Sequence, residues 1–141
     1  MTARKDSGAD KGAGSERRIL VVDDETGFRD MLSWNLRGDG IEVDTAKDGL
    51  EAQRKLAEEG FGYALVLTDI TMPGVDGLKL LHHIRGLAPS LPVILMTGFG
   101  TVEMAVEAMK DGATDFILKP FDVQGMIGRV RRILGLALAA G

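Results

Sequence analysis

Residues 64–77 read A-L-V-L-T-D-I-T-M-P-G-V-D-G. The run begins with apolar residues and leads into Asp69, after which Met72, Pro73 and Gly74 turn the chain. Short apolar runs bounded by turn residues are typical of strands buried on both faces. Open α/β sheets bind their ligands at the carboxyl ends of such strands. Asp69 is therefore the first candidate functional residue, although an isolated Asp at a strand end more often starts a turn or caps a helix.

The composition bounds the class of protein. At 141 residues the chain suits one domain, which buries about two thirds of the surface of its unfolded form. Hydrophobic residues make up 45% and charged residues 27%, and a net charge of -4 gives no general attraction to nucleic acid or to anionic membranes. The absence of Cys excludes a thiolate nucleophile and Cys-ligated zinc. No secretory leader and no apolar run of ~18 residues is present, so we expect a cytoplasmic protein.

The two ends of the chain differ from its centre. Residues 1–16 combine Gly with Ser, Ala and charges of both signs, which predicts a flexible N-terminal tail. Residues 17–135 carry the periodic apolar patterns of one folded unit. Residues 136–141 are either a C-terminal tail or the start of a linker.

Strand and helix patterns alternate through the folded unit. Continuous apolar runs predict buried strands, while the alternation at 41–45 predicts an edge strand with one wet face. The buried strands lie at 19–22, 64–68, 93–96 and 116–118, and helical spacing occurs at 28–36, 48–59, 78–88, 102–109 and after Asp122, which is placed to cap the last helix. Five strands alternating with five helices predict an α/β fold, a doubly wound parallel sheet with helices on both faces.

The helix at 102–109 has apolar residues on two sides. The side predicted to face the core consists of Val102, Ala105, Val106 and Met109. Met104 and Ala108 then occupy the other side. They form either a docking patch or ordinary exposed apolar side chains, and the sequence leaves both open.

Polar residues follow several of the predicted strands. All strands of a parallel sheet end at the same edge, so this pattern brings together Asp23, Asp24, Asp69, Thr97 and Lys119. Like charges ~4 Å apart repel by about 4 kcal/mol at an effective dielectric constant near 20, so three carboxylates beside one Lys need further positive charge. Oxygen donors of this kind suit Mg²⁺. A site of this composition binds phosphoryl oxygens and leaves one Asp free to attack phosphorus.

Four motifs resemble those of a known family, the receiver domains of bacterial two-component response regulators. They are V-V-D-D-E at 21–25, L-T-D-I-T-M-P-G-V-D-G at 67–77, M-T-G at 96–98 and D-F-I-L-K-P-F at 115–121. The segment 97–121 looks most like receivers of the nitrogen-regulation class. The resemblance implies that residues 17–135 are a receiver domain with a five-stranded parallel sheet in the order 2-1-3-4-5, a flavodoxin-like three-layer sandwich.

The resemblance also implies roles for the residues at the strand ends. Asp69 would accept a phosphoryl group from a sensor histidine kinase. Asp24, Asp69 and the main-chain carbonyl of Thr71 would hold Mg²⁺, with Asp23 acting mainly through bound water. The other predicted roles are a phosphoryl-oxygen partner in Lys119, a switch formed by Thr97 and Phe116, and a cis peptide bond between Lys119 and Pro120.

The output surface implied by the resemblance combines the helix at 102–109, the strand at 116–118 and the last helix. We expect a homodimer or an output domain to bind there through Met104, Ala108, Arg129 and Arg132, with no direct contact to nucleic acid or membrane. The chain would be no enzyme beyond its own phosphorylation and dephosphorylation. It would be either a stand-alone receiver or part of a longer regulator.

Two other functions compete with the receiver. A haloacid-dehalogenase-like phosphatase also combines an Asp nucleophile with Mg²⁺, but such enzymes carry a second Asp two residues after the nucleophile, where this chain has Thr71. A receiver-like module that binds partners without phosphorylation is the other alternative, and the complete set of strand-end residues argues against it.

Overall fold

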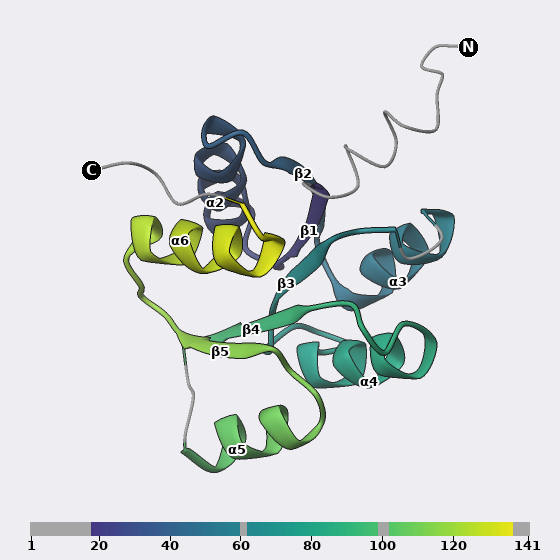
Figure 1. The fold of residues 1–141 in the computed structure, drawn as a ribbon. Coiled ribbons are helices and arrows are strands. Elements are labelled where there is room, and N and C mark those ends of the chain that lie inside the picture. The colour runs from purple at the N-terminus through teal and green to yellow at the C-terminus, as the bar shows by residue number, and fades with distance from the viewer. Residues whose placement is uncertain (1–17, 60–61, 99–101, 137–141) are drawn as a thin grey trace.

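The computed structural model describes residues 18–59, 62–98 and 102–136. Over these residues, strands and helices alternate along the chain (Figure 1). The strands are β1 (Arg18–Val22), β2 (Glu42–Ala46), β3 (Leu65–Asp69), β4 (Val93–Thr97) and β5 (Asp115–Leu118). The helices are α2 (Thr26–Gly38), α3 (Gly49–Glu58), α4 (Gly77–Leu87), α5 (Val102–Lys110) and α6 (Val123–Leu134). None of these helices is long and apolar enough to cross a membrane.

The strands form one parallel sheet in the order β2-β1-β3-β4-β5, which confirms the predicted fold. Helices α2 and α6 cover one face of the sheet, and α3, α4 and α5 cover the other (Figure 1). Successive residues of a strand point to opposite faces. Leu20 and Val22 therefore join the core beneath α3 and α4, while Ile19 and Val21 join the core beneath α2 and α6.

Burial follows the position of each strand in the sheet. Every residue of β3 and β4 is buried, as continuous apolar runs between two layers of helices require. Strand β2 is less buried, with Glu42 exposed and Asp44 and Thr45 half-buried, and it lies at the edge of the sheet as its sequence pattern predicts. The sheet therefore has a dry centre, and the chain first becomes exposed just after β1, β3 and β4, at Asp24, Thr71 and Gly98.

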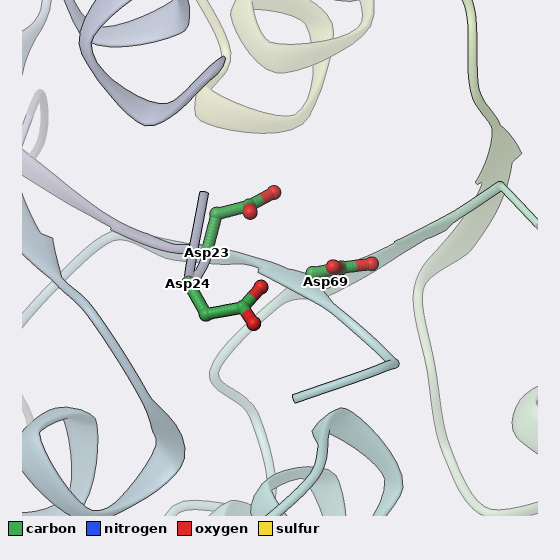
Figure 2. Close-up of side chains that lie close together, drawn as sticks. All are labelled: Asp23, Asp24 and Asp69. Atoms are coloured by element: carbon green, nitrogen blue, oxygen red, sulfur yellow. The ribbon is translucent and has the colours of Figure 1, made fainter. Parts of the chain in front are cut away.

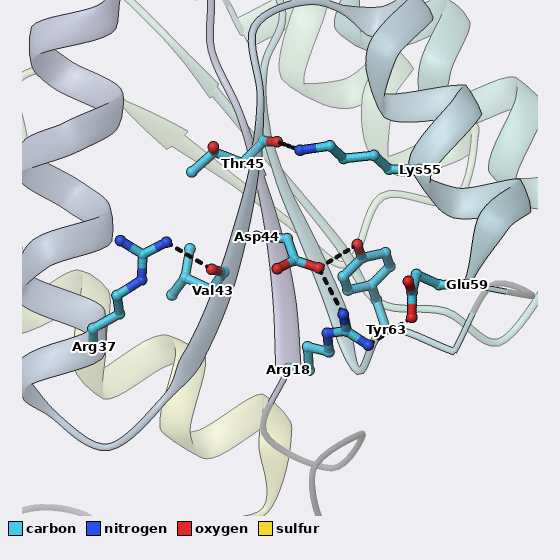
Figure 3. Close-up of polar contacts among 8 residues, drawn as sticks. All are labelled: Arg18, Arg37, Val43, Asp44, Thr45, Lys55, Glu59 and Tyr63. Carbon is cyan, nitrogen blue, oxygen red and sulfur yellow. Dashed lines mark hydrogen bonds and ion pairs between the residues drawn. The ribbon is translucent and has the colours of Figure 1, made fainter. Parts of the chain in front are cut away.

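Side chains cover the open edge of β2 (Figure 3). Arg37 Nη2 donates a hydrogen bond of 2.8 Å to the carbonyl oxygen of Val43, and Lys55 Nζ donates one to the carbonyl oxygen of Thr45. Such cationic side chains block the pairing of an edge strand with another chain. On the same strand, Asp44 accepts a hydrogen bond of 2.6 Å from the hydroxyl of Tyr63. These contacts fix β2 against the neighbouring helices and the loop before β3.

Helix α5 packs with the face opposite to the one predicted. Ala108 is fully buried in the core and Met104 packs against that core, so neither forms an exposed docking patch. The exposed side instead carries Val102, Val106 and Met109, with exposed fractions of 78%, 47% and 48%. The prediction of the core-facing side was wrong because both sides of this helix are apolar, so periodicity alone does not select one of them.

Candidate metal centre

Three carboxylates meet at the carboxyl edge of the sheet (Figure 2). Asp23 and Asp24 directly follow β1, and Asp69 is the last residue of the neighbouring strand β3. One carboxylate oxygen from each lies within 4.8 Å of the others. Asp23 and Asp69 are buried and Asp24 is exposed. The juxtaposition expected from the strand ends is therefore present, with one side open to solvent.

Asp23 is fixed by contacts to both of its carboxylate oxygens. Oδ1 accepts the backbone N–H of Glu25 at 2.9 Å, and Oδ2 accepts Lys119 Nζ at 2.8 Å. The backbone of Asp23 is held as well, because its N–H donates to the Ala46 carbonyl and its carbonyl accepts Arg29 Nη1. Both carboxylate oxygens of Asp23 are therefore engaged by groups of the protein itself.

Lys119 follows the last strand and reaches across the edge of the sheet. Its backbone N–H donates to the carbonyl oxygen of Thr97 at 2.8 Å, and its peptide bond to Pro120 is cis, as the resemblance implies. Its Nζ lies 2.8 Å from Asp23 Oδ2 and 3.7 Å from Asp69 Oδ2, and its side chain is 18% exposed. One ammonium group beside three carboxylates leaves an excess of negative charge at the site.

Burial and the neighbouring charges both shift the pKa of Asp69, and burial has the larger effect. Burial raises the pKa of the Asp69 carboxyl above its usual value, and the charge of Asp23 raises it further. Lys119 and the backbone N–H groups of Thr71 and Ile70 act in the opposite direction and lower that pKa, but the net direction is upward. A further cation beside Asp69 would favour its ionised, nucleophilic form.

The start of α4 packs directly beneath Asp69. The N–H of Gly77 donates to the carbonyl oxygen of Ile70 at 2.8 Å, and Asp76 caps the helix by accepting the N–H of Lys79 at 2.9 Å. A Cβ atom on Gly77 would lie 2.3 Å from the carbonyl oxygen of Asp69. Only glycine allows this close approach, so Gly77 contributes to the position of Asp69.

Thr97, Thr71 and Phe116 are the remaining predicted site residues, and the first two lie closer in the sheet and chain to Asp69 than Phe116 does. Thr97 is fully buried at the end of β4, one residue beyond Met96, the register partner of Asp69. Thr71 is exposed, two residues after Asp69. Phe116 lies near the start of β5, half-buried against the core beneath α3 and α4. The structure thus gathers the carboxylates and Lys119, and places Phe116 further back along the sheet.

The donor atoms fit a hard divalent cation. Carboxylate oxygens are the ligands that Mg²⁺ prefers, whereas zinc sites favour Cys and His. The chain has no Cys, and His82 lies on α4 paired with Asp111 at 2.9 Å. Asp24 is the exposed member of the three carboxylates, and Asp23 and Asp69 are buried.

An aromatic pair beside Lys119 was not recognised as part of the site from the sequence. The ring centroid of Phe28 lies 4.0 Å from Lys119 Nζ, and Phe28 contacts Phe121 edge to face with centroids 5.7 Å apart. Sequence periodicity identifies Phe28 only as an apolar residue of the first helical segment. The available signal was its position just after Asp23 and Asp24, together with the position of Phe121 just after Lys119 and Pro120.

The fold and the strand-end residues define the class: a flavodoxin-like α/β domain with an acidic, lysine-containing centre at the carboxyl edge of its sheet. Residues 19–131 match the model of the response regulator receiver domain. The chain belongs to this family, and that membership favours the receiver over a dehalogenase-like phosphatase.

Known relatives agree with this assignment. The transcriptional regulatory protein ZraR of Klebsiella oxytoca is 44% identical over 110 residues, which are 78% of this chain and 24% of that protein. The response regulator protein FleR of Pseudomonas aeruginosa is 43% identical over 118 residues, covering 82% of this chain and 24% of FleR. The receiver domain of NtrX from Brucella abortus superposes with a TM-score of 0.77 at 40% identity, covering 84% of this chain and 99% of that one. The chain thus spans about a quarter of the length of ZraR and FleR.

Proposed function

We propose that Asp69 accepts a phosphoryl group from the phosphohistidine of a sensor histidine kinase. A carboxylate oxygen of Asp69 attacks phosphorus, the new P–O bond forms as the P–N bond breaks, and the imidazole leaves with the electron pair. The observation that carries this proposal is the approach of Lys119 Nζ to Asp69, at 3.7 Å, beside two further carboxylates. That arrangement supplies a nucleophile and a cation for the phosphoryl oxygens at one point.

Asp24, Asp69 and the main-chain carbonyl of Thr71 would hold Mg²⁺, and Asp23 would contribute through bound water. The engaged oxygens of Asp23 and the exposure of Asp24 support this division of roles. The metal ion supplies positive charge that offsets the charge of the phosphoryl oxygens. Lys119 orients one of those oxygens by a charge-assisted hydrogen bond.

Thr97 and Phe116 would then report the phosphorylation to the surface. We propose that the Thr97 hydroxyl turns towards the phosphoryl group and that Phe116 moves inward into the space it leaves. The burial of Thr97 next to the register partner of Asp69, and the half-buried state of Phe116, support this proposal. Phe116 has no hydroxyl group, so its two positions would differ in packing alone.

We place the output surface on α5, β5 and α6, as the resemblance implies, with a corrected set of apolar residues. Val102, Val106 and Met109 are exposed on α5, Leu118 is 54% exposed on β5, and α6 adds the exposed Arg129 and Arg132. A homodimer or an output domain would bind here.

Because ZraR is named a transcriptional regulator, we further propose that this receiver controls transcription in the cytoplasm. It would do so through an output domain and would not itself contact DNA.

Charged substitutions on α5 test this surface. Val106→Lys with Met109→Lys is expected to weaken dimer or partner binding roughly tenfold or more, because an apolar contact becomes two ammonium groups that must lose water. Sedimentation of the phosphorylated protein measures self-association, and titration with the output domain measures partner binding. Leu50→Lys on α3, where Leu50 is 68% exposed, is the matched control. Equal binding by the double variant and this control would exclude the α5 surface.

Phosphoryl uptake should require a divalent cation. Incubation with acetyl phosphate and Mg²⁺ is expected to increase the protein's mass by one phosphoryl group, and the same incubation with EDTA in place of Mg²⁺ should leave the mass unchanged. Intact-protein mass spectrometry measures both. A mass that stays constant with Mg²⁺ present would reject the proposed function.

We also propose that the chain acts only on its own phosphoryl group. Hydrolysis of other phosphate esters is therefore not expected.

A further inference from the structure

The ammonium group of Lys119 contacts an aromatic ring as well as two carboxylates. Its Nζ lies 4.0 Å from the ring centroid of Phe28, 2.8 Å from Asp23 Oδ2 and 3.7 Å from Asp69 Oδ2. The negative face of an aromatic ring attracts a cation at this distance. Three different groups therefore surround the Lys119 ammonium, and the ring is the one without formal charge.

The ring itself packs against the core, on a helix that is tied to the site. Phe28 belongs to α2, is partly buried against the core beneath α2 and α6, and meets Phe121 edge to face at an interplanar angle of 80°. The next residue, Arg29, donates a hydrogen bond of 2.7 Å to the carbonyl oxygen of Asp23. The helix that carries the ring is thus tied to the same loop that carries the carboxylates.

A lysine side chain has a flexible four-carbon stem and a compact, strongly hydrated charge, so its position needs partners. Of its two carboxylate partners, Asp69 changes from a carboxylate to an acyl phosphate in the proposed reaction, so Asp23 alone keeps its charge throughout. The attraction of the Phe28 ring does not depend on the chemical state of Asp69. The ring is therefore a constant partner for the ammonium before and after phosphoryl transfer.

We propose that Phe28 is a positioning residue for Lys119, whose aromatic face holds the ammonium beside Asp69 in readiness for a phosphoryl oxygen. This inference rests on the proposed function of Asp69 and adds a residue to it. The competing explanation is that Phe28 only fills space between α2 and the segment that carries Phe121. The two explanations differ in whether the effect of Phe28 depends on Lys119.

A double-mutant cycle separates these explanations. Phe28→Leu keeps apolar volume but removes the aromatic face, and is expected to slow phosphoryl uptake from acetyl phosphate roughly two- to fivefold, the worth of one partly exposed cation–π contact. Lys119→Met removes the cation and keeps the stem. In the Lys119→Met background, Phe28→Leu should have no further effect on the rate. Phe28→Tyr, which keeps the aromatic face, should restore the rate of the unsubstituted protein.

Phe121→Leu is the matched control, because it removes the other ring of the pair, whose own contact is with Phe28. Its effect on the uptake rate should be the same with Lys119 and with Met at that position. If Phe28→Leu slows uptake equally in both backgrounds, or if Phe28→Tyr is as slow as Phe28→Leu, Phe28 serves only as packing and the proposal is wrong.

A second measurement needs neither metal nor phosphoryl group. In the metal-free protein, ring current from Phe28 should shift the NMR signals of the Lys119 Cε protons upfield, and Phe28→Leu should return them to the ordinary lysine position while Phe121→Leu does not. An unshifted Lys119 signal in the unsubstituted protein would overturn the positioning role. Failure of the unsubstituted protein to take up a phosphoryl group, with the ring-current shift intact, would instead reject the proposed function.

Discussion

Asp69→Asn is expected to abolish phosphoryl uptake and, at the same time, to raise the free energy of unfolding of the metal-free protein at neutral pH. Uptake is lost because the amide has no nucleophilic carboxylate oxygen. Stability rises because burial and Asp23 raise the pKa of the Asp69 carboxyl, which means that its ionised form is disfavoured in the folded state. The substitution keeps the shape of the side chain and removes that charge.

The stability gain of Asp69→Asn should depend on pH in a direction that follows from the raised pKa of Asp69. A carboxyl whose pKa is higher in the folded state than in the unfolded state binds more protons when folded, so its contribution to stability falls as the pH rises through these pKa values. The advantage of Asp69→Asn should therefore be present at pH 7 and should shrink as the pH is lowered towards 3.8, the ordinary pKa of Asp. Urea unfolding in EDTA across this range measures it. A loss of stability at pH 7 would contradict the charge balance described for the site.

Gly77→Ala should lower the free energy of unfolding by about 3 kcal/mol, at the upper end of the usual cost of overpacking. The added Cβ would lie 2.3 Å from the carbonyl oxygen of Asp69 and 2.7 Å from Cα of Ile70, and backbone atoms cannot rotate away as a side chain can. The backbone at Asp69 and Ile70 must therefore shift. Phosphoryl uptake should fall as well, and urea unfolding together with the uptake rate measures both effects.

Gly86→Ala is the matched control on the same helix, since the Cβ it would add meets no other part of the described structure within 4 Å. Alanine is the better helix former, so this variant should gain about 0.5–1 kcal/mol and keep the normal uptake rate. Gly77→Ala with unchanged stability and unchanged uptake would show that the contact beneath Asp69 does not position it.

Much of the fold could be predicted because the sequence pattern and the topology restrict each other. Apolar runs as long as those of β3 and β4 need helices on both faces, and parallel strands then end at one edge. Asp23, Asp69 and Lys119 come together for that reason, although the runs that precede them are far apart in the chain. The apolar periodicity of the strands and their common direction were therefore enough to predict that these three side chains lie together.

The buried face of α5 could not be predicted in the same way. Helical periodicity identifies the two sides of a helix, but α5 has apolar residues on both, and only tertiary packing selects between them. The side that packs on the core carries Ala108, which is smaller than Val106 and Met109, and the latter two are exposed. A count of apolar residues favours the opposite side, which is why the docking surface was first assigned to Met104 and Ala108.

The contact between the Phe28 ring and Lys119 could not be predicted from the sequence either, for a different reason. Strand order places the loops after β1 and β5 at the same edge, but the contact depends on the path of the chain after Lys119 and on the rotation of α2 about its axis. Neither is encoded in a local pattern. Contacts between the ends of different elements are set by packing, whereas the elements themselves follow from periodicity.

The most direct measurement is the chemical location of the phosphoryl group. Borohydride reduces an acyl phosphate to an alcohol, so treatment of the phosphorylated protein should convert one aspartate into homoserine, and peptide mass spectrometry locates it. Homoserine at position 69, and at no other position, is the expected result. Homoserine at position 23 or 24 would contradict Asp69 as the phosphoryl acceptor, as would phosphorylated protein that borohydride leaves unreduced.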